Sequence, residues 1–237
     1  MEAAVRYFSA VKTFVLDLLF PKLCLGCGVE GVSFCEACRS RMARPAPSCP
    51  VCSKRNFTGI LCTSCAEKSG LRRFLAPFSY RDPLVRELIH TYKYAGVRGL
   101  AALFADEIAA FLEAYGIRPN KTFRLVPIPL HRSRERERGF NQAELLAKEL
   151  GERLELPLGE LLARRRATES QIDMESYQKR RENVADAFRV TDPAAVKNKS
   201  IILVDDVSTS GATFSEAARV LRGAGARTVW AIVVAKG

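Results

Sequence analysis

The sequence predicts an α/β protein: a parallel sheet with helices on both faces, preceded by a small cysteine-rich module. Three observations support this fold class. All eight cysteines of the 237-residue chain lie between positions 24 and 65. Two aliphatic runs, 200–205 and 228–235, are typical of parallel strands that are covered on both faces. A stretch with helical character separates these two runs, which is the order of a strand–helix–strand unit.

The first predicted element is an amphipathic helix over residues 1–22. Its polar residues form one stripe at helical spacing, which suits a helix packed on protein. They are Arg6, Ser9, Thr13 and Asp17. No run reaches the roughly 18 apolar residues of a membrane span, and Glu2 precedes the first base, so the cationic start of a secretory signal is missing. We therefore expect a cytoplasmic chain without a stable membrane span. The alternative for residues 1–22 is a helix that lies on a membrane surface.

The cysteines form four Cys-x-x-Cys pairs and predict two structural zinc ions. Two such pairs complete a closed shell of four sulfur atoms, which leaves no position for a catalytic water. A disulfide scaffold is disfavoured, because the rest of the chain has no cysteine and no secretory signal is present; an iron–sulfur cluster is the other alternative. The spacing leaves open which pairs share an ion. Sequential pairing gives Cys24, Cys27, Cys35 and Cys38 for one site and Cys49, Cys52, Cys62 and Cys65 for the other.

We expect residues 23–70 to form this double zinc ribbon, with a stiff, proline-containing connector over 43–50 between the two sites. A segment of this length buries little apolar surface, so metal binding supplies its folding free energy.

Residues 71–237 then form the predicted α/β domain. In chain order the sequence predicts helices over 84–94 and 101–115, an extended stretch over 123–130 whose prolines suit a strand end, a charged loop over 131–139, a helix over 141–153, a strand over 200–205, a helix over 212–222 and a strand over 228–235. The last three elements make a βαβ unit, so ligand-binding loops are expected at the carboxyl ends of parallel strands.

The most informative stretch is 201–213, Ile-Ile-Leu-Val-Asp-Asp-Val-Ser-Thr-Ser-Gly-Ala-Thr. Two acids end the strand, and small hydroxyl residues with a glycine open the next helix. Backbone amides there form an anion-binding nest suited to phosphate, whereas a Walker A sequence does not occur. Carboxylates beside such a nest suit hydroxyl groups or a metal-chelated pyrophosphate. The candidate residues are Asp205, Asp206, Val207, Ser208, Thr209, Ser210, Gly211, Ala212 and Thr213.

This stretch resembles the signature of type I phosphoribosyltransferases at all 13 positions. The resemblance implies that Asp205 and Asp206 contact the ribose hydroxyls, directly or through Mg²⁺, and that residues 207–213 hold the 5-phosphate of phosphoribosyl pyrophosphate. It also implies a pyrophosphate-binding loop, for which 131–139 is the candidate, and a flexible closing loop, for which 164–183 is the candidate. Arginines match phosphate oxygens bidentately, although a solvated loop paired with its own glutamates is the alternative. The pyrophosphate candidates are Arg132, Arg136 and Arg138.

Taken together, both halves resemble the ComF (ComFC) family of competence-associated proteins nearly end to end. The matching segments are Phe-Pro-x-x-Cys at 20–24, the cysteine pairs, Ile-His-Thr-Tyr-Lys-Tyr-Ala-Gly at 89–96, Arg-Glu-Arg-Gly-Phe-Asn-Gln at 136–142, and 171–188 with Arg181 and Asn183. The resemblance implies a double zinc ribbon followed by a type I phosphoribosyltransferase domain. It also places Lys93 at a family-typical position, as a further candidate for the site.

From these observations we expect Mg²⁺-dependent binding of phosphoribosyl pyrophosphate and pentosyl transfer to an unidentified acceptor, in a protein associated with natural competence and DNA uptake. Two alternatives stay open: a non-catalytic factor that binds single-stranded DNA, and a sensor of phosphoribosyl pyrophosphate. The net charge of +11 suits a polyanionic partner. Aromatic residues compatible with stacking on a single strand are Phe74, Phe78, Tyr80, Tyr92 and Tyr94. The resemblance also implies partners in the DNA-uptake machinery.

Overall fold

The computed structural model divides the chain into two compact units, Met1–Ala43 and Arg44–Gly237. It describes residues 23–46, 48–49, 51–52, 54–56, 58–94, 97–166 and 177–237, except the side chains of Tyr177, Gln178 and Arg181. The helix predicted over 1–22 lies outside the described residues, as do parts of the predicted connector and closing loop.

In the first unit, the described residues form a cysteine-rich turn followed by helix α2 (Glu36–Arg41). Leu23 and Glu30 form an antiparallel bridge, and the amide of Cys24 donates to the carbonyl of Val29 at 2.8 Å. The chain reverses at Gly28 with φ +75°, a conformation that favours glycine because a β-carbon would clash with the backbone.

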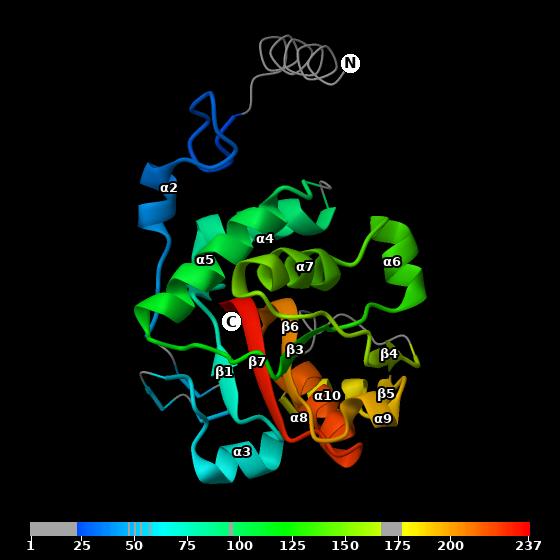
Figure 1. Cartoon of the computed structure of the whole chain (residues 1–237). Coiled ribbons are helices and arrows are strands. Elements are labelled where there is room, and N and C mark those ends of the chain that lie inside the picture. Colours follow the sequence, from blue (N-terminus) through cyan, green and yellow to red (C-terminus); the bar gives the residue numbers. More distant parts are fainter. Residues whose placement is uncertain are drawn as a thin grey trace, which may run out of the picture. The chain divides into compact units, whose positions relative to one another are not determined.

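The second unit is built around a parallel sheet of five strands (Figure 1). Its order is β1 (Arg73–Leu75), β7 (Thr228–Lys236), β6 (Ser200–Ser208) and β3 (Phe123–Pro127), with β2 (Phe78–Ser79) also pairing with β7. Val204 of β6 pairs with Ile232 on one side and Pro127 on the other. The carboxyl ends of these strands therefore meet at one edge, and the predicted parallel sheet is confirmed.

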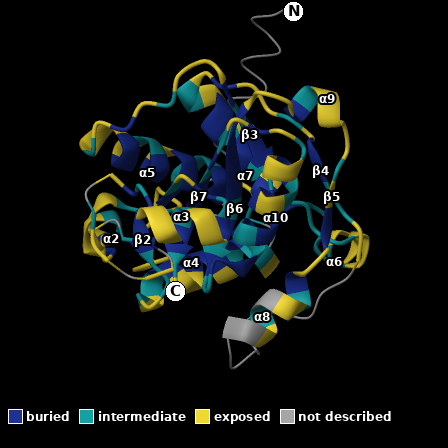
Figure 2. Ribbon diagram, turned by 90° about the horizontal axis from the view of Figure 1, so that it is seen from below, coloured by how far each residue is buried: buried dark blue, intermediate teal, exposed yellow. Residues whose placement is uncertain are grey.

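Helices cover both faces of this sheet, because alternate residues of each strand point to opposite faces. Ile201 and Leu203 of β6 join a hydrophobic cluster with Phe214 of helix α10 (Ala212–Gly223). On the other face, helix α7 (Gln142–Leu154) packs against β3 and β6, and the strands between these layers are largely buried (Figure 2). The expected helix–sheet–helix arrangement is therefore confirmed.

The remaining long helices match their predicted ranges to within about one residue. They are α4 (Pro83–Tyr94) and α5 (Leu100–Ala114). Helix α5 packs against α7, and α4 packs against α5. These contacts bring the end of α4 toward the strands that carry the candidate site.

The loop predicted over 131–139 is wrong, because the structure has a helix there, α6 (Arg132–Arg138). His131 precedes the helix, and its Nδ1 accepts a hydrogen bond from the amide of Ser133 at 3.3 Å. Gly139 ends the helix with φ +75°, the usual left-handed cap. Arginine and glutamate are good helix formers, so the charged composition that indicated a loop is also compatible with an exposed helix between two caps.

A separate antiparallel pair, β4 (Leu162–Arg164) and β5 (Phe188–Val190), flanks the predicted closing loop. The later part of that loop, predicted over 164–183, forms helix α8 (Tyr177–Val184), whereas residues 167–176 are not described. After β5, the short helix α9 (Pro193–Val196) leads into β6.

The second cysteine group belongs to the second unit and is packed into its core. Helix α3 (Thr63–Ser69) ends at Gly70 with φ +71° and packs on α10. Cys49 and Cys65 lie in the same hydrophobic cluster as Phe74 and Phe214.

Candidate functional site

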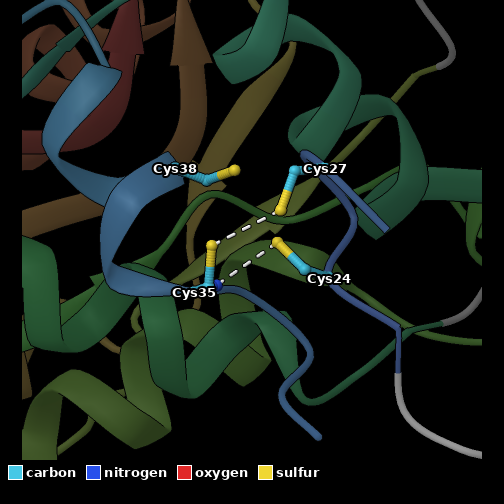
Figure 3. Close-up of side chains that lie close together, drawn as sticks. All are labelled: Cys24, Cys27, Cys35 and Cys38. Atoms are coloured by element: carbon cyan, nitrogen blue, oxygen red, sulfur yellow. Dashed lines mark hydrogen bonds between the residues drawn. The ribbon is translucent and has the colours of Figure 1, made fainter. Parts of the chain in front are cut away.

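Each cysteine group brings four sulfur atoms within 4.8 Å of one another. The groups are Cys24, Cys27, Cys35 and Cys38, and Cys49, Cys52, Cys62 and Cys65, which is the sequential pairing. The Sγ atoms of Cys27 and Cys35 are 3.6 Å apart (Figure 3), as are those of Cys52 and Cys62. Zinc–sulfur bonds of about 2.3 Å in a tetrahedron separate the sulfurs by about 3.8 Å. Both groups are thus consistent with a structural zinc ion.

Backbone amides favour the thiolate form in both groups. Burial raises the pKa of Cys24, but amides of Cys35, Gly26 and Cys27 outweigh it and lower that pKa to about 6; the Cys35 amide is 3.3 Å from the sulfur. In the second group, the Lys54 amide leads the contributions that lower the pKa of Cys52 to about 7. By contrast, burial leads the contributions that raise the pKa of Cys38 to about 12, and the Cys62 side chain leads those that raise the pKa of Cys65 to about 12. The backbone turns thus favour the metal-binding thiolate form at one sulfur of each group, Cys24 and Cys52.

The predicted phosphate loop connects the end of β6 to the start of α10. The chain turns at Gly211 with φ +77°, where only glycine adopts the conformation without strain. The hydroxyl of Ser210 accepts from the amide of Ala212 at 3.4 Å, and the carbonyl of Gly211 accepts from Ser215 at 2.9 Å. A turn of this kind at a helix N-terminus presents backbone amides to an anion.

The two acids at the end of β6 have different surroundings. Asp206 is 5% exposed, and its carboxylate lies 3.1 Å from Nζ of Lys93 at the end of α4. Asp205 accepts from the amide of Asp206 at 2.9 Å, and its pKa is raised to about 7, first by burial and then by the charge of Asp206. Burial lowers the pKa of Lys93, but the two aspartates outweigh it and leave it above its ordinary value.

A cavity of about 290 Å³ opens at this edge of the sheet. It brings together most of the predicted site residues, from the strand end, the phosphate loop and two helices. Those that line it are Lys93, Arg138, Asp205, Asp206, Val207, Ser208, Thr209, Gly211 and Thr213. Ser210 and Ala212 belong to the same loop but do not line the cavity. Acids, amides and cations thus converge on one space.

Helix α6 presents only one of its faces to this cavity. Arg134 and Arg138, four residues apart, line it and therefore share a helix face. Arg132 and Arg136 do not line it, and both are exposed. A helix rather than a loop explains this separation, because its 3.6-residue period divides alternating arginines between two sides.

Several residues that line the cavity were not singled out as contacts of phosphoribosyl pyrophosphate, although two of them, Tyr80 and Tyr94, were candidates for stacking on DNA. They are Tyr80, Tyr94, Arg134, Glu137, Gln142 and Arg164. Arg164 donates to the carbonyl of Pro129 at 3.3 Å and lies over the Phe188 ring at 5.3 Å. Burial lowers its pKa, followed by the charge of Arg134. The Nε2 atom of Gln142 is buried and has no hydrogen-bond partner among the described residues. The i, i+4 spacing of Arg134 and Arg138 is the one local pattern in the sequence that could have indicated that Arg134 shares a helix face with Arg138.

Three aromatic residues expected as stacking candidates for single-stranded DNA are part of the core. Phe74, Phe78 and Tyr92 are each 2% exposed or less, so their rings cannot stack on a base. Tyr94 is 56% exposed and Tyr80 is half-buried; both line the cavity.

A larger cavity, of about 1090 Å³, lies among α3, α8 and α10. Its walls alternate bases and acids, and Glu216 there accepts from Arg219 at 2.8 Å and from the amide of Asp186 at 2.9 Å. Of the predicted loop residues it contacts Ala212 alone, so the smaller cavity is the candidate site.

Among the described residues, no helix combines the length and the apolar character needed to cross a bilayer.

Comparison with protein families identifies two domains. Residues 137–237 match the phosphoribosyl transferase domain, and residues 15–68 match the double zinc ribbon domain. Among solved structures, the allosteric regulatory enzyme of purine biosynthesis has a TM-score of 0.35 and 19% identity, with coverage of 57% of this chain and 24% of that chain.

Curated relatives match over most of their length. Competence protein ComFC of Bacillus subtilis is 31% identical over 197 residues, covering 79% of this chain and 77% of the relative. DNA utilization protein YhgH of Escherichia coli is 31% identical over 231 residues, covering 91% and 98%. Competence protein F of Haemophilus influenzae is 28% identical and covers 87% of each chain. The chain therefore belongs to the ComF (ComFC) family, with a double zinc ribbon and a phosphoribosyltransferase domain.

Proposed function

We propose that the chain binds phosphoribosyl pyrophosphate with Mg²⁺ and transfers the phosphoribosyl group to an acceptor. The observation that carries this proposal is the cavity of about 290 Å³ in which the acid pair of β6, the phosphate loop and the cations of α4 and α6 converge. The segments 1–22, 23–70 and 71–237 are proposed as the N-terminal helix, the double zinc ribbon and the transferase domain.

The cavity offers a distinct group to each part of this ligand. Backbone amides and hydroxyls of residues 207–213 suit the 5-phosphate. The carboxylates of Asp205 and Asp206 suit the ribose hydroxyls, which donate hydrogen bonds to them. Arg138 and Lys93 suit the pyrophosphate, and the positions of Arg134 and Arg164 in the lining add two guanidinium groups for the same purpose.

The acid pair also fits Mg²⁺, which prefers carboxylate oxygens and keeps several waters or substrate oxygens. Asp205 and Asp206 would hold the ion, and Mg²⁺ there supplies neutralisation of the charge on the departing pyrophosphate. The nearby Lys93, 3.1 Å from Asp206, keeps the buried carboxylate paired when no ligand is present. Two zinc ions held by the cysteine groups would have a structural role, since each group offers four sulfur ligands and leaves no position for a catalytic water.

In the proposed reaction, a nucleophile on the acceptor forms a bond to C1 of the ribose. The bond from C1 to the pyrophosphate oxygen breaks, and its electron pair leaves with pyrophosphate. The residues of the cavity hold the 5-phosphate and the hydroxyls, so that C1 is oriented toward the acceptor. Arg138 and Lys93 stabilise negative charge as it develops on the leaving group, so the step requires no protein nucleophile.

Calorimetric titration with phosphoribosyl pyrophosphate and Mg²⁺ tests this assignment. We expect Asp205→Asn to weaken binding at least tenfold, because the amide loses the charge that accepts hydroxyl hydrogen bonds and binds Mg²⁺. Asp106→Asn is the matched control: Asp106 is half-exposed on α5 and pairs with Arg153, outside the cavity. Equal affinity of Asp205→Asn and the wild type would contradict the active-site assignment.

Release of pyrophosphate then separates a transferase from a sensor. Release in the presence of any one acceptor, absent in Asp205→Asn, marks catalysis. Tight binding without release across nucleobase, amine and nucleic-acid acceptors marks a sensor.

We also propose single-stranded DNA as a partner. The names of the relatives refer to competence and DNA utilization, and Tyr94 and Tyr80 leave aromatic surface at the cavity. Exposed tyrosine beside arginine suits base stacking and phosphate contact together. Proteins of a DNA-uptake machinery are proposed as partners on the names of the relatives alone.

A further inference from the structure

Helix α6 carries arginines to the cavity but contributes no residue to the core. None of its seven residues, all within the described part of the chain, is buried. An exposed helix of this length is marginal by itself, and a free arginine side chain has about 2 kcal/mol of rotamer entropy to lose on binding. The guanidinium of Arg138 therefore needs a fixed partner if it is to face the cavity before a ligand arrives.

Tyr94 is such a partner. Nη2 of Arg138 donates a hydrogen bond to the hydroxyl of Tyr94 at 3.2 Å, and the guanidinium carbon lies 4.9 Å from the centre of the Tyr94 ring. The ring and the hydroxyl thus hold the same side chain in two ways. Burial does not explain this tyrosine, since 56% of it is exposed.

Neighbouring contacts hold the last turn of α4, which carries Tyr94. His90, one turn earlier in α4, packs against the Tyr94 ring with the ring centres 4.8 Å apart. Tyr92 is fully buried, and its hydroxyl donates to the carbonyl of Gln142 at 2.7 Å. Lys93 pairs with Asp206 at 3.1 Å. The last turn of α4 is therefore tied to α7 and to β6 through Tyr92 and Lys93, the two residues that directly precede Tyr94.

We propose that Tyr94 is a positioning residue, which holds the guanidinium of Arg138 toward the cavity for the pyrophosphate group of the ligand. This inference rests on the proposed function. Tyr94 acts by reducing the freedom that Arg138 loses on binding, which is preorganisation. It thus contributes to pyrophosphate recognition through Arg138 and contributes little to the 5-phosphate end of the ligand.

Two ligands, four variants and a control variant test the inference by calorimetry with Mg²⁺. For Tyr94→Ala we expect about tenfold weaker binding of phosphoribosyl pyrophosphate and unchanged binding of ribose 5-phosphate, which lacks the pyrophosphate. Tyr94→Phe keeps the ring and loses the hydroxyl, so it should recover part of the affinity. Adding Tyr94→Ala to Arg138→Ala should cause no further loss, because the tyrosine acts through the arginine.

Tyr115→Ala is the matched control, since Tyr115 ends helix α5 and packs on Phe111 with ring centres also 4.8 Å apart, away from the cavity. It should bind both ligands like the wild type. Wild-type protein that binds no phosphoribosyl pyrophosphate would overturn the proposed function itself. If the wild type binds, full affinity of Tyr94→Ala, a loss shared equally by ribose 5-phosphate, or additive losses in the double variant would overturn the role of Tyr94.

Discussion

At the scale of single residues, Asp205 and Asp206 differ in their electrostatic surroundings, because among the described residues only Asp206 has a cationic side chain within hydrogen-bond distance. Asp206 is neutralised by Lys93 at 3.1 Å. Asp205 has its own neighbour's amide as a donor, which does not outweigh burial and the charge of Asp206. The strand end thus stores an unfavourable negative charge that hydroxyl groups or Mg²⁺ would relieve.

This arrangement predicts a pH dependence of stability. The pKa of Asp205 is about 7 in the folded chain against 3.8 for an ordinary aspartate, so the folded state holds the proton more tightly. Ionisation therefore costs stability as the pH rises from about 4, and the cost levels off above pH 7. Between pH 5.5 and 8 it should grow by about 2 kcal/mol.

Urea unfolding of the wild type and Asp205→Asn without Mg²⁺ measures this cost. The difference in unfolding free energy, wild type minus variant, should fall over that pH interval, because other titrations cancel in the comparison. A difference that is constant or rises with pH would contradict the raised pKa.

At the scale of elements, the sequence predicts local features well and long-range contacts poorly. The stretch 201–213 is a strand, a turn and a helix in immediate succession, and each Cys-x-x-Cys turn is set by four residues, so spacing alone indicates both. The secondary structure of the charged stretch 131–139 is harder to predict, because glutamate and arginine suit a helix as well as a loop. The caps at His131 and Gly139 favour the helix. The pairing of Lys93 with Asp206 depends on how α4 packs, which no local pattern contains.

The two zinc sites should differ in what they stabilise. Cys49 and Cys65 are 1% and 5% exposed and share a hydrophobic cluster with Phe214 at the start of α10. Nζ of Lys236, at the end of β7, donates to the carbonyl of Cys49 at 3.4 Å. The second site is thus joined to α10, which begins at the phosphate loop, and to β7, which pairs with β6, whereas the first lies in the other compact unit.

We therefore expect Cys52→Ser to lower the melting temperature of the second unit by about 5–10 °C and to weaken ligand binding. Cys27→Ser is the matched control, because Cys27 is also exposed and holds the corresponding position in the first group. Each variant should lose one of two zinc ions by elemental analysis, and Cys27→Ser should leave the main transition and the ligand affinity unchanged. Equal effects of the two substitutions would contradict this difference.

At the scale of the whole molecule, the zinc sites change what the net charge means. The chain has a formal charge of +11, and two ions held by eight thiolates would bring it to about +7. Residues 71–237 contain 28 basic and 21 acidic side chains, so the remaining excess lies in this part of the chain. Four of these bases line the candidate site: Lys93, Arg134, Arg138 and Arg164. A small phosphorylated ligand thus accounts for part of the positive charge that also suits nucleic acid.

If single-stranded DNA binds to the same basic side chains, DNA and phosphoribosyl pyrophosphate should compete for the site. Fluorescence anisotropy with a labelled oligothymidine should show binding at low salt, with a log–log salt slope of about −2 to −3 for three or four phosphate contacts. Saturating phosphoribosyl pyrophosphate should weaken that binding, and Arg134→Ala with Arg138→Ala should flatten the slope.

Lys68→Ala with Arg72→Ala is the control, because it removes the same charge from the other cavity. It should leave the slope closer to that of the wild type. A flat slope or no binding at low salt would remove DNA as a partner, and equal effects of the two double substitutions would place the DNA outside the cavity.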